Sequence, residues 1–234
     1  LTIAEPDVRI EQLDDGQLDL LVAFGVTDEP STEPPTAWEG LEWLVTLPET
    51  TLADGRLSWV SGETTQVVEA LSLSTDLSVG GGRLASLSDL SIHAEPEGYA
   101  PIDLTGVLRY DAGNLFIDAL SLSYDESRVG VEGTIHQVEL DMALGLTVTL
   151  DPLAAGQLSQ WTNDQTPMTD LTGSFSVRGP LSEMQIDGWL RSEAGDLALN
   201  GGLDLTAESM SWALTAQTDR LDLDELLPLS LIHI

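Results

Sequence analysis

The 234-residue chain contains no cysteine and no lysine, and only three of its residues are phenylalanine. The absence of cysteine excludes disulfides, thiolate metal sites and cysteine nucleophiles. No run of 18 or more apolar residues occurs, so the sequence predicts no membrane-spanning helix. The chemistry that remains available must come from other side chains or from the surface pattern of the fold.

Positive charge is scarce. The eight basic residues are all arginine and face 40 acidic residues, which gives a formal net charge of −32. Such a surface repels nucleic acid and anionic membrane faces, so we expect neither as a partner. Self-repulsion destabilises the compact state at low salt, and a screening length of about 3 Å at ~1 M salt removes it. The charge predicts a salt-loving or marine source, with an ordinary acidic extracytoplasmic protein as the alternative.

The two ends of the sequence look artificial. Leu1 opens the chain without an initiator methionine, a charged leader or an apolar segment. Residues 229–234 read Leu-Ser-Leu-Ile-His-Ile, which matches one reading frame of a transposon adapter used in sequencing libraries. We interpret them as an adapter-derived tail and expect an internal fragment of a longer protein; a genuine apolar tail is the alternative.

Strict alternation of apolar and polar residues dominates the chain, and 140–150 is the clearest case. Side chains alternate sides along a strand, so this segment predicts one strand with an apolar and a polar face. Similar patterns predict strands at 18–26, 55–60, 67–73, 84–94, 102–110, 115–124, 128–135 and 139–150. Gly80-Gly81-Gly82 predicts a turn, and 151–158 predicts a short helix with Asp151 as its N-cap and Pro152 in its first turn.

The pattern predicts four regions: first strands at 1–27, a proline-rich acidic loop at 28–40, one elongated β-structure at 41–228, and the tail. Within the third region, 102–161 and 169–228 resemble each other as two repeats of about four strands and a helical cap.

The expected fold class is all-β: an elongated, curled, mostly antiparallel sheet with short helical caps. A sheet of a dozen strands extends roughly 55 Å and must curl, split or close. A barrel or sandwich would fill its apolar side with side chains, whereas a U-shaped section would leave an open apolar groove. Composition does not separate these two outcomes.

Four phrases of the sequence resemble the AsmA-like superfamily, most closely the TamB-type translocation and assembly module proteins: 52–59, 106–110 leading to 117–122, 173–181 and 219–228. The resemblance covers most of 41–228. It implies a β-sheet rolled into a U-shaped apolar groove (a β-taco) in a periplasmic protein anchored to the inner membrane through a segment missing here. It implies that the groove carries phospholipid acyl chains for outer-membrane biogenesis, with an outer-membrane assembly partner reached through missing regions.

The expected groove lining is the set of inward-facing residues: Leu104, Leu108, Leu115, Ile117, Val129, Val131, Ile135, Leu140, Met142, Leu144, Leu146, Val148, Phe175, Val177, Ile186, Leu197, Leu199, Leu203, Leu205, Trp212 and Leu214. The first hypothesis is therefore a non-enzymatic lipid-conduit segment. The second is an extracellular β-solenoid or adhesin-like structural module whose apolar face is a filled core. A third, a carbohydrate-active β-helix enzyme, lacks a distinctive carboxylate pair.

No pattern indicates a catalytic, cofactor or metal site. The sequence has no Gly-x-Ser-x-Gly nucleophile elbow and no histidine pair with metal-ligand spacing. Gly80-Gly81-Gly82-Arg83 lacks the lysine of a phosphate-binding loop. His93 and His136 each adjoin an apolar strand residue, so both are expected to point outward.

Overall fold

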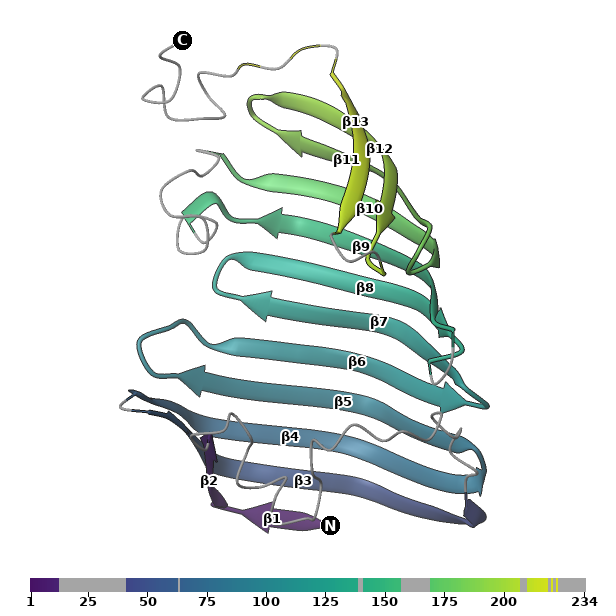
Figure 1. Ribbon diagram of the computed structural model, residues 1–234. Helices are drawn as coiled ribbons and strands as arrows, with labels where there is room; N and C mark the ends of the chain where they lie inside the picture. The colour runs from purple at the N-terminus through teal and green to yellow at the C-terminus, as the bar shows by residue number, and fades with distance from the viewer. Residues whose placement is uncertain are drawn as a thin grey trace. The chain divides into compact units, whose positions relative to one another are not determined.

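A computed structural model describes residues 1–12, 41–62, 64–138, 141–156, 169–206, 210–218, 220 and 222. Nearly all of this part is β-strand, and its thirteen strands follow the order β1-β3-β4-β5-β6-β7-β8-β9-β10-β11-β12-β13, with β2 also paired to β3 (Figure 1). This confirms the predicted all-β class and the mostly antiparallel sheet. The expected strand at 18–26 and the loop at 28–40 lie outside the described residues.

The chain divides into two compact units, residues 1–109 and 110–234. The first unit contains β1 (Thr2–Ala4), β2 (Asp7–Gln12), β3 (Leu41–Ser61), β4 (Thr64–Gly82), β5 (Leu84–Pro96) and most of β6 (Ile102–Asp111). Strands β3, β4 and β5 pair antiparallel, whereas β1 and β2 pair parallel to β3. Sequence alternation did not predict the two short parallel strands.

The strands of the first unit are longer than predicted. The expected strands at 55–60 and 67–73 are only parts of β3 and β4, which have 21 and 19 residues. Register shifts interrupt both strands, and positive-φ residues such as Asp54 and Ala70 occur at them. A bulge inserts one residue and reverses the parity of those that follow, so a continuous strand loses its period-2 pattern.

The three glycines predicted as a turn are instead the last residues of β4, and the turn to β5 is at Arg83. Strand β4 ends at Gly82 and β5 begins at Leu84. Gly80 has a φ of 118°, and a Cβ there would collide with the carbonyl oxygen of Trp43 on β3. Glycine is therefore required at this position for both conformation and space.

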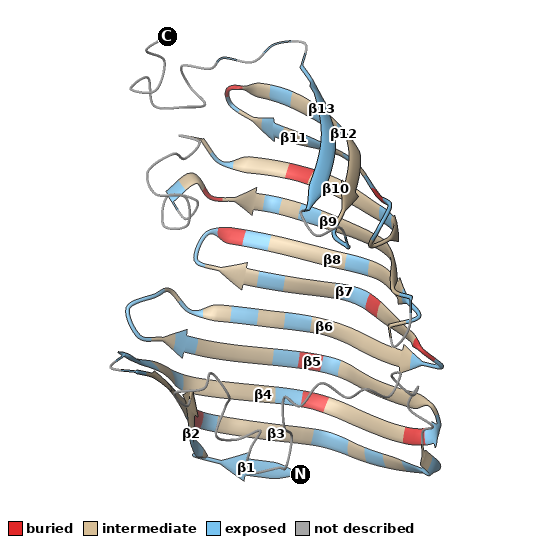
Figure 2. Ribbon diagram, in the orientation of Figure 1, coloured by how far each residue is buried: buried red, intermediate tan, exposed pale blue. Residues whose placement is uncertain are grey.

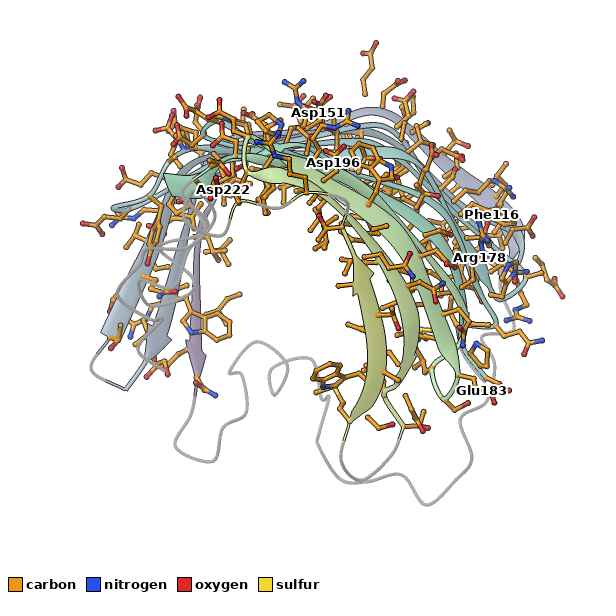
Figure 3. All side chains as sticks on the ribbon, turned by 90° about the horizontal axis from the view of Figure 1, so that it is seen from above. Phe116, Asp151, Arg178, Glu183, Asp196 and Asp222 are labelled. Atoms are coloured by element: carbon orange, nitrogen blue, oxygen red, sulfur yellow. The ribbon has the colours of Figure 1, made fainter. Side chains whose placement is uncertain are left out.

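The second unit contains β7 (Asn114–Tyr124), β8 (Ser127–His136), β9 (Ala143–Leu153), β10 (Leu171–Pro180), β11 (Met184–Ser192), β12 (Gly195–Asp204) and β13 (Ser211–Gln217). Each strand pairs antiparallel with the next. Strands β10 to β13 bend along their length, which gives each a convex and a concave side (Figure 3).

Strand β9 corrects two predictions. It begins at Ala143 rather than at 139; Met142 precedes it, and Leu140 lies outside the described residues. Asp151 and Pro152 belong to the strand, and helical conformation begins only at Ala155. The Ala155 amide donates to Asp170 Oδ1 at 3.0 Å, so the carboxylate at this helix start comes from a residue distant in sequence.

Each of the two expected repeats holds four strands. Residues 102–161 contain β6 to β9, and 169–228 contain β10 to β13. The helical turn at 155 follows the first set. Its expected counterpart after β13 lies outside the described residues.

The described part has little deeply buried side-chain volume. Leu90, Ile117 and Met184 are the largest buried apolar residues, at 4–7% exposure, and no described side chain is below 2%. Most strand positions are half-buried, as the prevailing tan of Figure 2 shows. Apolar side chains are therefore shielded mainly by their neighbours on the same sheet face, not by a thick second layer.

Replacing Gly133 by alanine should destabilise the second unit by about 1–3 kcal/mol. Gly133 has a φ of 132°, and a Cβ there would collide with the carbonyl oxygen of Gly145 on β9. Gly145→Ala is the matched control, because its Cβ would meet only ordinary contacts, the nearest at 3.5 Å. Urea unfolding of the two variants measures the difference, and equal stabilities would contradict the prediction.

The free energy of unfolding should rise with salt. Two ion pairs of described residues, Arg9–Glu11 at 3.0 Å and Arg191–Asp196 at 2.9 Å, are exposed, and such pairs offset little of a net charge of −32. Thermal unfolding in NaCl between ~0.1 M and ~1 M, where the screening length falls from about 10 to about 3 Å, tests this. Stability that ignores NaCl, or an equal gain in a non-ionic osmolyte, would argue against charge repulsion.

Candidate functional site

The most distinctive feature of the second unit is a set of apolar rows that cross its strands. Residues directly opposite each other in a ladder lie on the same face. Four such rows, which together we call the apolar face, contain only apolar residues and glycine: Leu122-Val129-Leu150-Gly173-Leu190-Leu197; Leu120-Val131-Val148-Phe175-Gly188-Leu199-Ala216; Ile117-Gly133-Leu146-Val177-Ile186-Gly201-Leu214; and Leu115-Ile135-Leu144-Gly179 with Met184-Leu203-Trp212. Seven strands at 4.8 Å spacing make this face roughly 29 Å wide.

Most residues predicted as groove lining lie in these rows. The structure brings together Leu115, Ile117, Val129, Val131, Ile135, Leu144, Leu146, Val148, Phe175, Val177, Ile186, Leu197, Leu199, Leu203, Trp212 and Leu214. Leu104 and Leu108 lie on β6, within the first unit, and both are half-buried. Leu205 follows β12 and is 39% exposed. These three, with Met142 and Leu140, are not members of the rows.

Two apolar-face residues on β7 were not predicted from sequence alternation. Leu120 pairs with Val131 and Leu122 with Val129, although both have the opposite parity to Ile117. A bulge between Ile117 and Leu120, where Ala119 has a φ of 53°, causes this change of parity. Leu190 was not predicted either. Ile186, Gly188 and Leu190 alternate along β11, and this alternation would have placed Leu190 on the apolar face.

Glycines in the rows stand opposite large side chains. Gly188 pairs with Phe175, Gly173 with Leu190 and Gly201 with Leu214. A Cβ built at these glycines would lie 2.5 Å from Phe175 Cδ1, 2.8 Å from Leu190 Cδ2 and 2.9 Å from Leu214 Cδ2. The large side chains therefore lie across the neighbouring glycines, which keeps them close to the sheet.

The opposite face of the same strands is polar. One of its rows reads Glu132-Thr147-Ser176-Asp187-Asn200-Thr215. Phe116 and Arg178, on a neighbouring row, lie on the convex side of the bent strands in Figure 3. The apolar face is therefore the concave side, and water contacts the polar side.

An open depression of about 1250 Å³ lies at the turn between β11 and β12 and includes Trp189, Arg191, Asp196 and Arg220. Trp189 pairs with Ser174 on the polar face and is 45% exposed. The guanidinium of Arg191 lies 5.5 Å from the Trp189 ring centroid and donates to Asp196. The hydrogen bond to Asp196 raises the pKa of Arg191, which keeps it charged. This pairing accounts for the exposed tryptophan without a ligand.

The first unit contains a small charged cluster at His93. His93 Nδ1 lies 2.7 Å from Asp103 Oδ1, and Nε2 lies 3.5 Å from Glu95 Oε1. Hydrogen bonds to Asp103 first and Glu95 second raise the pKa of His93 above its ordinary value of 6.5. All three side chains are more than a third exposed, so the cluster is a solvent-facing ion pair.

Asp103→Asn should lower the pKa of His93, as measured by NMR titration of its ring protons. Because the folded pKa is raised, the charged pair contributes stability below about pH 6.5 and loses that contribution as pH rises through the folded pKa. Thr105→Asn on the same strand is a control that leaves the pair intact. An unchanged His93 titration in Asp103→Asn would contradict the assignment.

Within the described ranges, no group of three histidine or acidic side chains is placed to hold a metal ion. No helix among the described residues is long and apolar enough to cross a membrane.

No protein-family model, curated protein or solved structure matches the chain.

Proposed function

We propose that this chain is a non-enzymatic lipid-carrying segment whose apolar face holds phospholipid acyl chains. The observation that supports this is the run of apolar rows across seven strands, over which the described residues place no layer of fully buried side chains. Contiguous exposed apolar surface beyond a few hundred Å² is unusual on soluble proteins and marks a site of interaction.

The chemistry of a lipid tail suits this surface. An acyl chain gains about 0.8 kcal/mol for each CH₂ group transferred out of water. Leucine and valine side chains that lie low over glycines, as Leu190 does at Gly173, offer a smooth surface without polar groups. The side chains of the rows offer no hydrogen-bonding group except the Trp212 indole and the weakly accepting Met184 thioether, so they favour the tail over the headgroup.

The charge of the chain limits which headgroups it tolerates. A net charge of −32 repels anionic headgroups, so a zwitterionic phospholipid, or one screened by salt or divalent cations, is the favoured cargo. The headgroup would remain in solvent at the edge of the apolar face.

The wider setting rests on the sequence resemblance alone. We propose a periplasmic location, anchoring to the inner membrane through a segment outside this chain, and an outer-membrane assembly partner that contacts regions outside it. The alternative function, a structural β-solenoid or adhesin-like module with a filled core, requires the apolar face to be covered in solution. Lipid mass spectrometry of the purified protein separates the two, because only the first hypothesis predicts bound phospholipid.

Leu146→Asp should abolish photo-crosslinking to a phospholipid with a diazirine-bearing tail, whereas Thr147→Asp should preserve it. The two residues are neighbours on β9 but lie on opposite faces, because Leu146 pairs with Val177 and Thr147 with Ser176. A carboxylate in the middle of the apolar face places a charge beside the acyl chain, which has no means of solvating it. Equal labelling of both variants, with unchanged circular dichroism, would refute the lipid proposal.

A further inference from the structure

The glycines of the second unit differ in the space around them, and the difference follows the face on which they lie. Gly130, Gly145 and Gly202 belong to the polar face, because they pair with Thr149, Thr134 and Gln185. A Cβ built at these three glycines would meet its nearest atom at 3.8, 3.5 and 3.5 Å, which are ordinary van der Waals distances. The polar face therefore has room for a side chain at each of them.

The apolar-face glycines of β10 and β11 have no such room. A Cβ at Gly173 would lie 2.5 Å from the carbonyl oxygen of Trp189, and one at Gly188 would lie 2.6 Å from the carbonyl oxygen of Ser174. Each obstructing oxygen belongs to the backbone of the adjacent strand. No change of side-chain rotamer can move it, so each position requires glycine or a shift of the two strands.

The same crowding occurs at two further apolar-face glycines. A Cβ at Gly133 on β8 would collide with the carbonyl oxygen of Gly145 on β9, and one at Gly201 on β12 with the carbonyl oxygen of Ala213 on β13. Strands β8, β10, β11 and β12 each have a described neighbour on both sides. The crowding is therefore a property of the interior of the sheet.

This asymmetry shows which way the sheet curls. The Cβ of an apolar-face residue would point toward the concave side, so a neighbouring backbone that takes its place also lies on that side. Adjacent strands are thus folded toward the apolar face at these glycines. Curling in the opposite direction would crowd the polar-face glycines instead. Figure 3 shows β10 to β13 bent toward their concave side.

We propose that Gly133, Gly173, Gly188 and Gly201 set the curvature of the second unit and thereby determine how closely its apolar face encloses an acyl chain. Glycine within a strand marks a tight bend or a place where another backbone approaches closely, and glycine kinks are a means of curving a sheet. The identity of the enclosed molecule rests on the proposed lipid-carrying function, whereas the control of curvature does not.

Curvature matters to an acyl chain because of the contact it provides. A curved apolar face contacts the chain from below and from both flanks, whereas a flat face contacts it from one side. Removal of CH₂ groups from water is the source of its affinity. Alanine at Gly173 and Gly188 forces the opposing carbonyls to withdraw from the apolar side, which opens the curve between β10 and β11.

A distance measurement tests the curvature directly. The chain has no cysteine, so Glu132→Cys and Asn200→Cys provide two unique sites for spin labels. Both residues are exposed in one row of the polar, convex face, and four strand spacings, roughly 19 Å, separate them along the sheet. Curling spreads outward-pointing labels apart. Double electron–electron resonance should therefore show a shorter mean distance when Gly173→Ala and Gly188→Ala are added.

Gly130→Ala with Gly202→Ala is the matched control, because both positions accept a Cβ without a collision. It should leave the distance between the labels unchanged. An unchanged distance in the folded Gly173→Ala, Gly188→Ala variant would overturn the proposal, and so would an equal shortening in the control. If the double variant does not fold, each of its two substitutions is measured alone under the same criteria.

Photo-crosslinking to the phospholipid with a diazirine-bearing tail tests the consequence for the cargo. If flattening removes about two CH₂ groups from contact, the lipid concentration for half-maximal labelling should rise roughly tenfold in Gly173→Ala with Gly188→Ala and stay unchanged in the control. Equal labelling of a variant whose label distance has shortened would overturn the link between curvature and cargo. Absence of labelling in the unsubstituted chain would instead refute the lipid-carrying function, so the two failures are distinguishable.

Discussion

In-register pairing of alternating strands is the constraint on which this structure depends. Each of seven strands places its apolar residues at every second position. Because opposite residues in a ladder share a face, pairing in register aligns these residues into four apolar rows. A shift of one residue between any two strands would turn one apolar set toward water. The hydrogen-bonded ladders of the second unit therefore determine both its stability and the surface it presents.

The same constraint explains why so few side chains are fully buried. A sheet with apolar residues on one side shields each side chain with its neighbours in the row and on adjacent strands, which leaves most of them half-exposed. Pairing of large residues with glycines, as at Phe175 and Gly188, keeps the face low and smooth. These two features suit a flexible apolar ligand, and the acidic polar face keeps the remainder of the sheet in water.

Alternation was a good guide on antiparallel strands without a bulge such as β8, although it did not predict the short parallel strands β1 and β2. It placed β8 at 128–135 and predicted most of the residues that form the apolar face. It failed at register shifts: Leu120 and Leu122 joined the face only because a bulge at Ala119 reversed the parity. Bulges depend on hydrogen bonds with the neighbouring strand, and a single sequence does not reveal them. The predicted helix start at Asp151 was wrong for a related reason. The carboxylate that accepts from the first helical amide, at Ala155, belongs to Asp170, which lies 15 residues further along the chain.

The sequence by itself determined the all-β class, the polar and apolar parity of most strands, the excess of negative charge and the absence of cysteine chemistry, because these depend only on residue type and local spacing. The tertiary structure decided which strands are neighbours, where bulges reverse parity and which residues complete the rows. These properties depend on backbone hydrogen bonds between residues far apart in the chain, and such bonds leave no periodic signal in the sequence.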